Sequence, residues 1–155
     1  KGFQPGGILV YDPFISPSVT RRFAVKKVSF KKLLEKADII SLHLPLTART
    51  VNMFAAAQFD QMKKNAVLVN TSRGSIVNEK ALYFALKNKK IAAAGLDVFQ
   101  NEPPPVGQPL FKLPNLVLTR HRGWYSRESY DELKTKAARN IRNALLGRKV
   151  SSRLN

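Results

Sequence analysis

The sequence predicts an α/β fold in which helices cover both faces of a parallel sheet. Short strand-like runs alternate with helix-like segments along the 155 residues. The interiors of these runs are almost entirely apolar, which is typical of parallel strands that are buried on both sides. The chain has no internal repeat and no low-complexity tract, so we expect a single ordered domain.

The first predicted strand covers residues 7–13, an apolar run that ends in Asp-Pro and therefore enters a turn. A helix is expected from Phe30, because apolar residues recur there at helical spacing. Residues 39–44 then form a second, buried strand. A short helix containing Phe59 and Met62 follows it.

Three further strands are predicted, over residues 66–71, 91–99 and 116–121. The segment 78–88 between the first two is a helix with one apolar face. That face consists of Ala81, Leu82, Ala85 and Leu86. The proline-rich stretch 101–109 is expected to be a rigid loop within the domain and not a linker.

The last predicted element is a long amphipathic helix that begins after Ser126. Serine is a favourable N-cap, and Glu128 in the first turn interacts well with the helix dipole. Gly147 suits the end of the helix. Apolar residues at spacings of three and four form one stripe along it: Tyr130, Leu133, Ala137, Ile141 and Leu145.

Composition excludes several classes of protein. A hydrophobic share of 44% excludes wholesale disorder. The absence of cysteine excludes disulfides, a thiol nucleophile and a cysteine zinc site, and two histidines, His43 and His121, are too few for a histidine-rich metal centre. No apolar run approaches the ~20 residues of a membrane span, and the N-terminus has no signal-peptide core. We therefore expect a cytoplasmic protein with no metal site and no membrane contact.

The positive charge leaves two interpretations open. Twenty-seven Lys and Arg against ten Asp and Glu give a net charge of +17, which favours nucleic acids, acidic metabolites or anionic surfaces as partners. The excess is spread along the chain, with eight basic and two acidic residues in 1–36 and ten and three in 120–155. No nucleic-acid motif accompanies it, so a solvated surface is favoured over nucleic-acid binding.

Side chains with useful chemistry collect directly after the predicted strands. Ligands of parallel α/β sheets bind beyond the carboxyl ends of the strands, so these positions are the candidates for a site. They are Asp12, residues 43–47, residues 71–74, residues 97–102 and His121.

Five ordered segments at these positions resemble the NAD-binding domain of the D-isomer-specific 2-hydroxyacid dehydrogenases. The segments are VYDP (10–13), SLHLPLT (41–47), NTSRG (70–74), GLDVFQNEPPP (95–105) and TRHRGWYS (119–126). The resemblance covers essentially the whole chain and is nearest to bacterial members related to C-terminal-binding corepressors and phosphoglycerate dehydrogenase. It implies a Rossmann-like doubly wound parallel sheet. It also implies an oxidoreductase that transfers a hydride between NADH and a small 2-keto acid.

The resemblance implies a catalytic set of Arg73, Glu102 and His121. Histidine, whose ordinary pKa is about 6.5, exchanges protons near neutral pH, and a carboxylate on its other ring nitrogen fixes the tautomer. The guanidinium fork suits a substrate carboxylate and can polarise the carbonyl under attack. From the residues alone, each of the three is equally compatible with a solvated surface position.

The implied cofactor is NAD. A carboxylate such as Asp12, placed after a strand, accepts hydrogen bonds from the adenosine ribose and repels a 2′-phosphate, which favours NAD over NADP. The alternative is a plain Asp-Pro turn in which Asp12 bonds only nearby backbone. His43 would contribute to the adenine-side wall together with Leu44 and Pro45, or else be a satisfied core histidine.

The resemblance places Thr71 and Asp97 on the nicotinamide side of the cofactor. The other positions that it implies for cofactor binding are Tyr11, Pro13, Thr50, Ser72, Arg73, His121 and Gly123. Trp124 and Tyr125 would border the site without selecting among small acids.

The sequence departs from the family pattern most clearly in its glycines. None of the eight takes the G-x-G-x-x-G spacing that cradles the pyrophosphate. The family's first strand, which lies between residues 7–13 and 39–44 in the sheet, and its substrate domain are not present either. We therefore expect residues 1–155 to be a partial NAD-binding domain of a homodimeric subunit about twice as long.

Smaller departures leave a second function class open. Arg120 stands where the family usually has proline, and with Arg122 it places two cations beside His121. These cations would either disfavour the imidazolium form or attract an anionic substrate. Asn78 stands where an acidic residue is common. The alternatives to the dehydrogenase are a catalytically weak NAD-binding scaffold, like the corepressors, and an inactive fragment.

Overall fold

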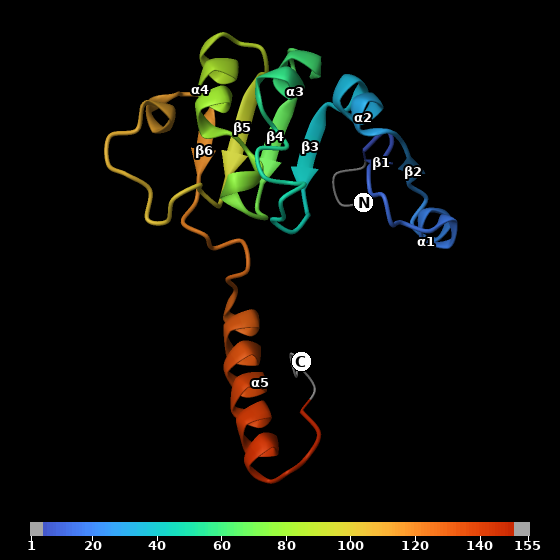
Figure 1. The fold of residues 1–155 in the computed structure, drawn as a ribbon, viewed down its shortest axis with the longest axis vertical. Helices are drawn as coiled ribbons and strands as arrows, with labels where there is room; N and C mark the ends of the chain where they lie inside the picture. Colours follow the sequence, from blue (N-terminus) through green and yellow to red (C-terminus); the bar gives the residue numbers. More distant parts are fainter. Residues whose placement is uncertain (1–4, 151–155) are drawn as a thin grey trace. The chain divides into compact units, whose positions relative to one another are not determined.

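The computed structural model describes residues 5–150, which belong to two compact units. The first unit is Lys1–Arg120 and contains both sheets, and the second is His121–Asn155 and contains one long helix (Figure 1). The elements of the first unit are β1 (Leu9–Val10), α1 (Pro17–Arg22), β2 (Lys26–Lys27), α2 (Phe30–Lys36), β3 (Ile39–Leu42), α3 (Ala56–Gln61), β4 (Val67–Asn70), η1 (Gly74–Ile76), α4 (Glu79–Lys87), β5 (Ala93–Leu96), η2 (Pro109–Lys112) and β6 (Leu116–Leu118).

Adjacent strands are parallel throughout. β3, β4, β5 and β6 form a four-stranded sheet in that order, and β1 pairs with β2 in a separate two-stranded sheet. In the larger sheet Ile39 lies opposite Val67, and Val67 opposite Ala93. The crossovers from β3 to β4 and from β4 to β5 contain α3 and α4, whereas the long crossover from β5 to β6 contains only the 3-10 helix η2. The predicted parallel α/β fold is confirmed.

The core of the first unit lies on one face of the four-stranded sheet. Ile40, Leu42, Leu68, Ala94 and Leu96 point into it from the strands. Helices α2, α3 and α4 cover that face and contribute one apolar cluster, which includes Leu34, Phe59, Leu82 and Leu86. Burial of these side chains supplies the main stabilising free energy of the fold.

Within residues 5–120, the expected helical cover of both sheet faces is found on one face only. The strand residues between the core positions are exposed or half-buried, and Ile39 and Val117 are 67% and 68% exposed. β3 therefore alternates between exposed and buried residues, whereas the sequence predicted a strand buried throughout. The apolar run was a correct signal for a strand, but apolar residues alone do not show whether a second layer covers them.

Helix α4 agrees closely with its prediction. The side chain of Asn78 caps it by accepting a hydrogen bond from the Ala81 amide at 2.9 Å. Leu82, Ala85 and Leu86 are buried as expected. The helix stops at Asn88, and Lys89 follows in the left-handed conformation with φ of 52°.

Two elements near the N-terminus were not predicted. Helix α1 begins after Ser16, whose hydroxyl accepts from the Val19 amide at 3.4 Å, and has Pro17 in its first turn. Strand β2 has only two residues. Such short elements give no measurable periodicity, although the Ser-Pro pair was a usable helix-start signal. Met62 lies just beyond α3 and not inside it.

A row of aromatic rings connects the β1 segment with the core. The Tyr11 and Phe30 ring centroids are 5.2 Å apart, and those of Phe30 and Phe54 are 5.6 Å apart in an edge-to-face arrangement. Phe54 and Phe59 continue the row at 6.5 Å. These contacts fix α2 between the small sheet and the main core.

The second unit consists mainly of helix α5 (Arg127–Leu145). Ser126 is its N-cap, as predicted, and accepts a hydrogen bond from the Ser129 amide at 3.1 Å. Hydrogen bonds from the Glu128 backbone and from Ser126 lower the pKa of the Glu128 carboxyl. Gly147 follows the helix with φ of 63°. In the part of the chain that the structure describes, no helix is both long and apolar enough to cross a membrane.

Candidate cofactor and substrate site

The loops that follow β3, β4 and β5 meet at the carboxyl edge of the sheet. The Ser72 hydroxyl donates to the Leu44 carbonyl at 2.7 Å, and the Leu44 amide donates to Ser72 Oγ at 3.2 Å. The Asp97 amide donates to the Asn70 carbonyl at 2.9 Å. Three predicted site segments of the first unit are therefore brought together, because parallel strands end at the same edge.

A buried asparagine shapes the turn that presents Arg73. Asn70 is fully buried at the end of β4, where its Nδ2 donates to the Arg73 carbonyl at 2.9 Å and its Oδ1 accepts from the Ser72 amide at 3.0 Å. The Arg73 side chain is exposed, and its Nη1 donates to the Ser72 carbonyl at 2.7 Å. A guanidinium has five N–H donors, so this bond leaves others for a carboxylate.

Glu102 lies in the loop after β5, and this loop packs against the residue that follows Arg73. Glu102 Oε1 accepts a hydrogen bond from the Phe99 amide at 3.0 Å. A Cβ added to Gly74 would lie 1.9 Å from the Phe99 carbonyl carbon and 2.6 Å from the Gln100 nitrogen. The structure thus brings the Arg73 turn and the Glu102 loop into backbone contact.

This contact predicts that Gly74→Ala is strongly destabilising. The added methyl group overlaps backbone atoms that no side-chain rotation can move, so we expect a loss of about 3 kcal/mol or more in the free energy of unfolding. Urea denaturation of the purified chain measures this loss in the free energy of unfolding. Gly95→Ala is the matched control, because nothing lies within 4 Å of its added Cβ. Equal stability of the two variants would contradict the close approach.

His121 belongs to the second unit, so the catalytic residues implied by the resemblance are divided between the units. It has φ of 52°, an uncommon conformation for a residue with a side chain. Its carbonyl accepts a hydrogen bond from Trp124 Nε1 at 3.1 Å. Gly123, which the resemblance assigns to the cofactor, also lies in this unit.

Asp12 forms the turn that the sequence allowed as an alternative to cofactor binding. Its Oδ1 accepts a hydrogen bond from the Phe14 amide at 2.8 Å. A carboxylate has acceptor sites on both oxygens, so this bond does not exhaust its capacity for a ribose hydroxyl. Of its neighbours, Tyr11 is partly exposed beside Phe30, and the Pro13 carbonyl accepts from Lys27 Nζ at 3.4 Å.

The loop after β3 is held by its own hydroxyl groups. Thr50 Oγ1 donates to the Pro45 carbonyl at 2.7 Å and accepts from the Thr47 amide at 2.7 Å. Thr50 therefore shapes the loop that carries Pro45. His43 is exposed and lies 2.7 Å from the Ser41 hydroxyl, measured from its Nε2, so it is not a core histidine.

Asp97 is the buried carboxylate of the site. It is 4% exposed at the end of β5, and the Thr119 hydroxyl donates to its Oδ1. Thr71 lies exposed at the end of β4. Thr119 was not among the predicted site residues, although it stands directly before the Arg-His pair of the last motif.

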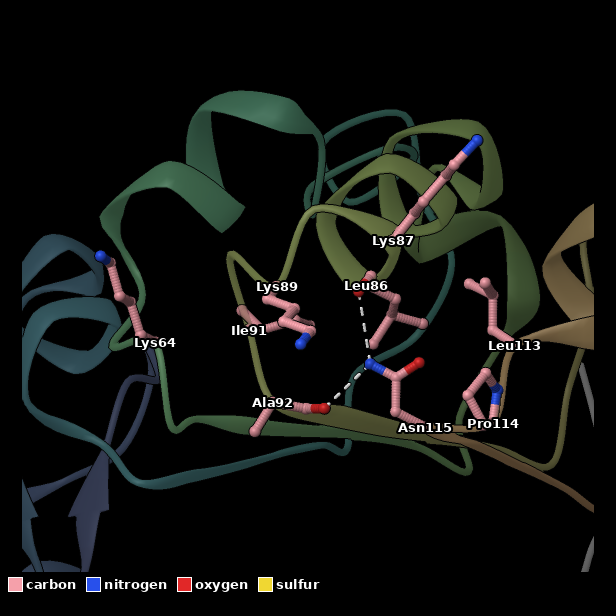
Figure 2. Close-up of a pocket in the computed structure, with 9 residues that line it drawn as sticks. All are labelled: Lys64, Leu86, Lys87, Lys89, Ile91, Ala92, Leu113, Pro114 and Asn115. Atoms are coloured by element: carbon pink, nitrogen blue, oxygen red, sulfur yellow. Dashed lines mark hydrogen bonds between the residues drawn. The ribbon is translucent and has the colours of Figure 1, made fainter.

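A hollow at the opposite edge of the sheet is lined by none of the predicted site residues (Figure 2). It has a volume of about 450 Å³, and Lys64, Ala92 and Asn115 lie just before β4, β5 and β6. Asn115 Nδ2 bridges the Leu86 and Ala92 carbonyls at 3.4 and 3.0 Å. Among residues 5–150, no group of three or more histidines or carboxylates could hold a metal ion.

Comparisons with known proteins agree with the parallel α/β fold. The family model described as D-isomer specific 2-hydroxyacid dehydrogenase, NAD binding domain, matches residues 2–123. Over 141 residues the chain is 46% identical to a glyoxylate reductase of Korarchaeum cryptofilum. The match covers 91% of this chain and 42% of the relative. Over 148 residues it is 40% identical to a D-3-phosphoglycerate dehydrogenase of Archaeoglobus fulgidus. That match covers 96% of this chain and 28% of the relative.

A solved structure gives the same result for the fold. The structure of D-lactate dehydrogenase with NAD⁺ from Lactobacillus jensenii matches with a TM-score of 0.87 at 31% identity. The match covers 96% of this chain and 48% of that chain. The chain thus spans less than half the length of each of these three relatives.

Proposed function

Because this chain belongs to the NAD-binding domain family of the D-isomer specific 2-hydroxyacid dehydrogenases, we propose that it forms part of the cofactor domain of a longer subunit. That subunit interconverts a small 2-keto acid and the corresponding D-2-hydroxy acid with NAD. The observation that carries the proposal is the backbone contact between the Arg73 turn and the Glu102 loop at the carboxyl edge of the sheet. Arg73 and Glu102, two residues of the implied catalytic set, lie on these adjoining loops, which supports the proposal.

The two separate sheets support the longer subunit. β1–β2 and β3–β6 share no strand pairing among the described residues, although all their strands are parallel. One further parallel strand between β1 and β3 would join them into the doubly wound sheet that the family resemblance implies. A glycine-rich turn after that strand would supply the pyrophosphate cradle that the glycines of this chain do not form.

The residues present fit the two ends of a dinucleotide. Asp12 has acceptor capacity for ribose hydroxyls, and its negative charge favours NAD over a 2′-phosphorylated cofactor. The buried Asp97 and the exposed Thr119 form a hydrogen-bonded polar pair suited to a carboxamide. The bound cofactor supplies the hydride for reduction and accepts it in the reverse direction.

The side chains of this chain do the remaining chemistry. Arg73 binds the substrate carboxylate through its planar fork, which orients the 2-carbonyl and polarises it. His121 donates a proton to the carbonyl oxygen as negative charge develops there. Glu102 stabilises the imidazolium form and its orientation. In the oxidation direction His121 takes the proton from the 2-hydroxyl group.

Three finer points belong to the same proposal. The relatives are a glyoxylate reductase, a D-3-phosphoglycerate dehydrogenase and a D-lactate dehydrogenase, so we propose a small 2-keto acid such as glyoxylate, hydroxypyruvate or pyruvate. The resemblance supports a homodimer formed through the cofactor domain. The chain lacks cysteine, which suits a cytoplasmic location.

A second candidate is a catalytically weak scaffold that binds NAD and an acidic partner. The net charge of +17 and the placement of His121 between Arg120 and Arg122 favour it. NADH oxidation with the three keto acids, measured beside DNA binding at several salt concentrations, separates the candidates. Rapid oxidation with weak DNA binding supports the dehydrogenase, and salt-dependent DNA binding without oxidation supports the scaffold.

A further inference from the structure

Glu79 is a buried carboxylate with a role that helix α4 does not require. It is 8% exposed, and the described residues provide no Lys or Arg partner for it. Burying a carboxylate without an opposite charge is costly unless hydrogen bonds compensate. Asn78 already caps α4, so Glu79 is not needed to begin the helix.

The Glu79 carboxylate instead bonds a distant loop. Its Oε1 accepts a hydrogen bond from the Gln100 amide at 2.7 Å, across 21 residues of sequence. A bond to a charged acceptor is among the stronger hydrogen bonds in proteins. It attaches the loop after β5 to the first turn of α4.

The same loop touches the Arg73 turn at one point and has an internal hydrogen bond beside that contact. The Phe99 backbone lies against Gly74, where even a Cβ would not fit, and the Phe99 amide donates to Glu102 Oε1 at 3.0 Å. Gly74 follows Arg73 directly in the sequence. The bond from Gln100 to Glu79 therefore attaches the loop that carries Glu102 to α4, next to the point where the loop meets Gly74.

We propose that Glu79 is a positioning residue that holds the 99–102 loop so that Glu102 stays beside the Arg73 turn. The catalytic part of this inference rests on the proposed function, whereas the anchoring itself rests on the contacts alone. The hydrogen bond that Glu79 accepts comes from the Gln100 amide and not from one of the three implied catalytic side chains, so Glu79 acts through the loop backbone.

Amide hydrogen exchange on the purified chain tests the anchoring directly. In Glu79→Ala the Gln100 amide loses its acceptor, and we expect it to exchange at least about tenfold faster than in the wild type. Glu79→Gln keeps an oxygen acceptor of the same shape, and we expect exchange within about threefold of the wild type. Ala85→Gly weakens the same helix without touching the loop and serves as the control.

Kinetics of the longer subunit test the positioning. We expect Glu79→Ala to lower kcat about tenfold, with little change in the KM for keto acid, because Glu102 acts on His121 and not on substrate binding. Glu79→Gln should restore most of the activity, and Ala85→Gly should keep wild-type kcat. Unchanged Gln100 exchange in Glu79→Ala, or equal loss of kcat in Ala85→Gly, would overturn the inference. If the longer subunit shows no turnover but the Gln100 amide still exchanges faster in Glu79→Ala than in the wild type, the proposed function is contradicted and the anchoring is supported.

Discussion

Replacing His121 with alanine is expected to lower the kcat of the longer subunit by about 10³-fold, with little change in the KM for keto acid. Removal of a general acid typically costs 10²–10⁴-fold in rate, because the proton is transferred in the transition state. Substrate binding depends on other groups, so the ground-state affinity is largely kept. Steady-state kinetics of NADH oxidation with pyruvate or hydroxypyruvate measure both constants.

The control for this variant comes from the same unit of the chain. Arg139→Ala removes an exposed cation from α5, and we expect wild-type kinetics. Circular dichroism and thermal unfolding of both variants show whether the fold is kept. A His121→Ala enzyme that retains kcat within about threefold of the wild type would contradict the assignment of the proton donor.

Replacing Arg73 is expected to change the KM for keto acid. We expect Arg73→Ala to raise the KM for keto acid about 100-fold, since it removes a charge-assisted, two-pronged bond to the substrate carboxylate. Arg73→Lys should recover little, because an ammonium keeps the charge but not the planar fork. The buried Asn70 holds the backbone of this turn in both variants, so the change is confined to the side chain.

Arg21→Lys is the matched control for Arg73→Lys. Arg21 is exposed on α1, and we expect its replacement to leave KM unchanged. Initial rates over a range of keto acid concentrations, at saturating NADH, give the comparison. Wild-type KM in Arg73→Ala would show that another group binds the carboxylate. The opposite behaviour of the His121 and Arg73 variants would separate proton transfer from substrate binding.

Much of the fold could be predicted because its longer elements have a clear pattern. Helix α4 buries Leu82, Ala85 and Leu86 on one face, and α5 begins after its Ser126 cap, both as the local sequence indicates. The two-residue strand β2 gives no such pattern. The exposure of Ile39 depends on which layers lie over the strand, a tertiary property that an apolar run does not encode.

The candidate site was predictable only in part. Parallel topology places the chemically active positions at one edge, so Ser72 and Asp97 could be assigned to that edge before the structure was known. The buried roles of Asn70 and Glu79 could not, because their partners lie in other segments or in the backbone. Polar residues of this kind look like ordinary surface positions in a sequence.

Hydride transfer itself is the most direct test of the proposed function. The longer subunit is incubated with NADH that carries deuterium at C4 and with pyruvate or hydroxypyruvate, and the product is examined by mass spectrometry and chiral chromatography. We predict a D-2-hydroxy acid with deuterium at C2 and one NADH consumed per product molecule. A folded subunit that binds NADH but forms no labelled hydroxy acid from any of the small keto acids would contradict the proposal.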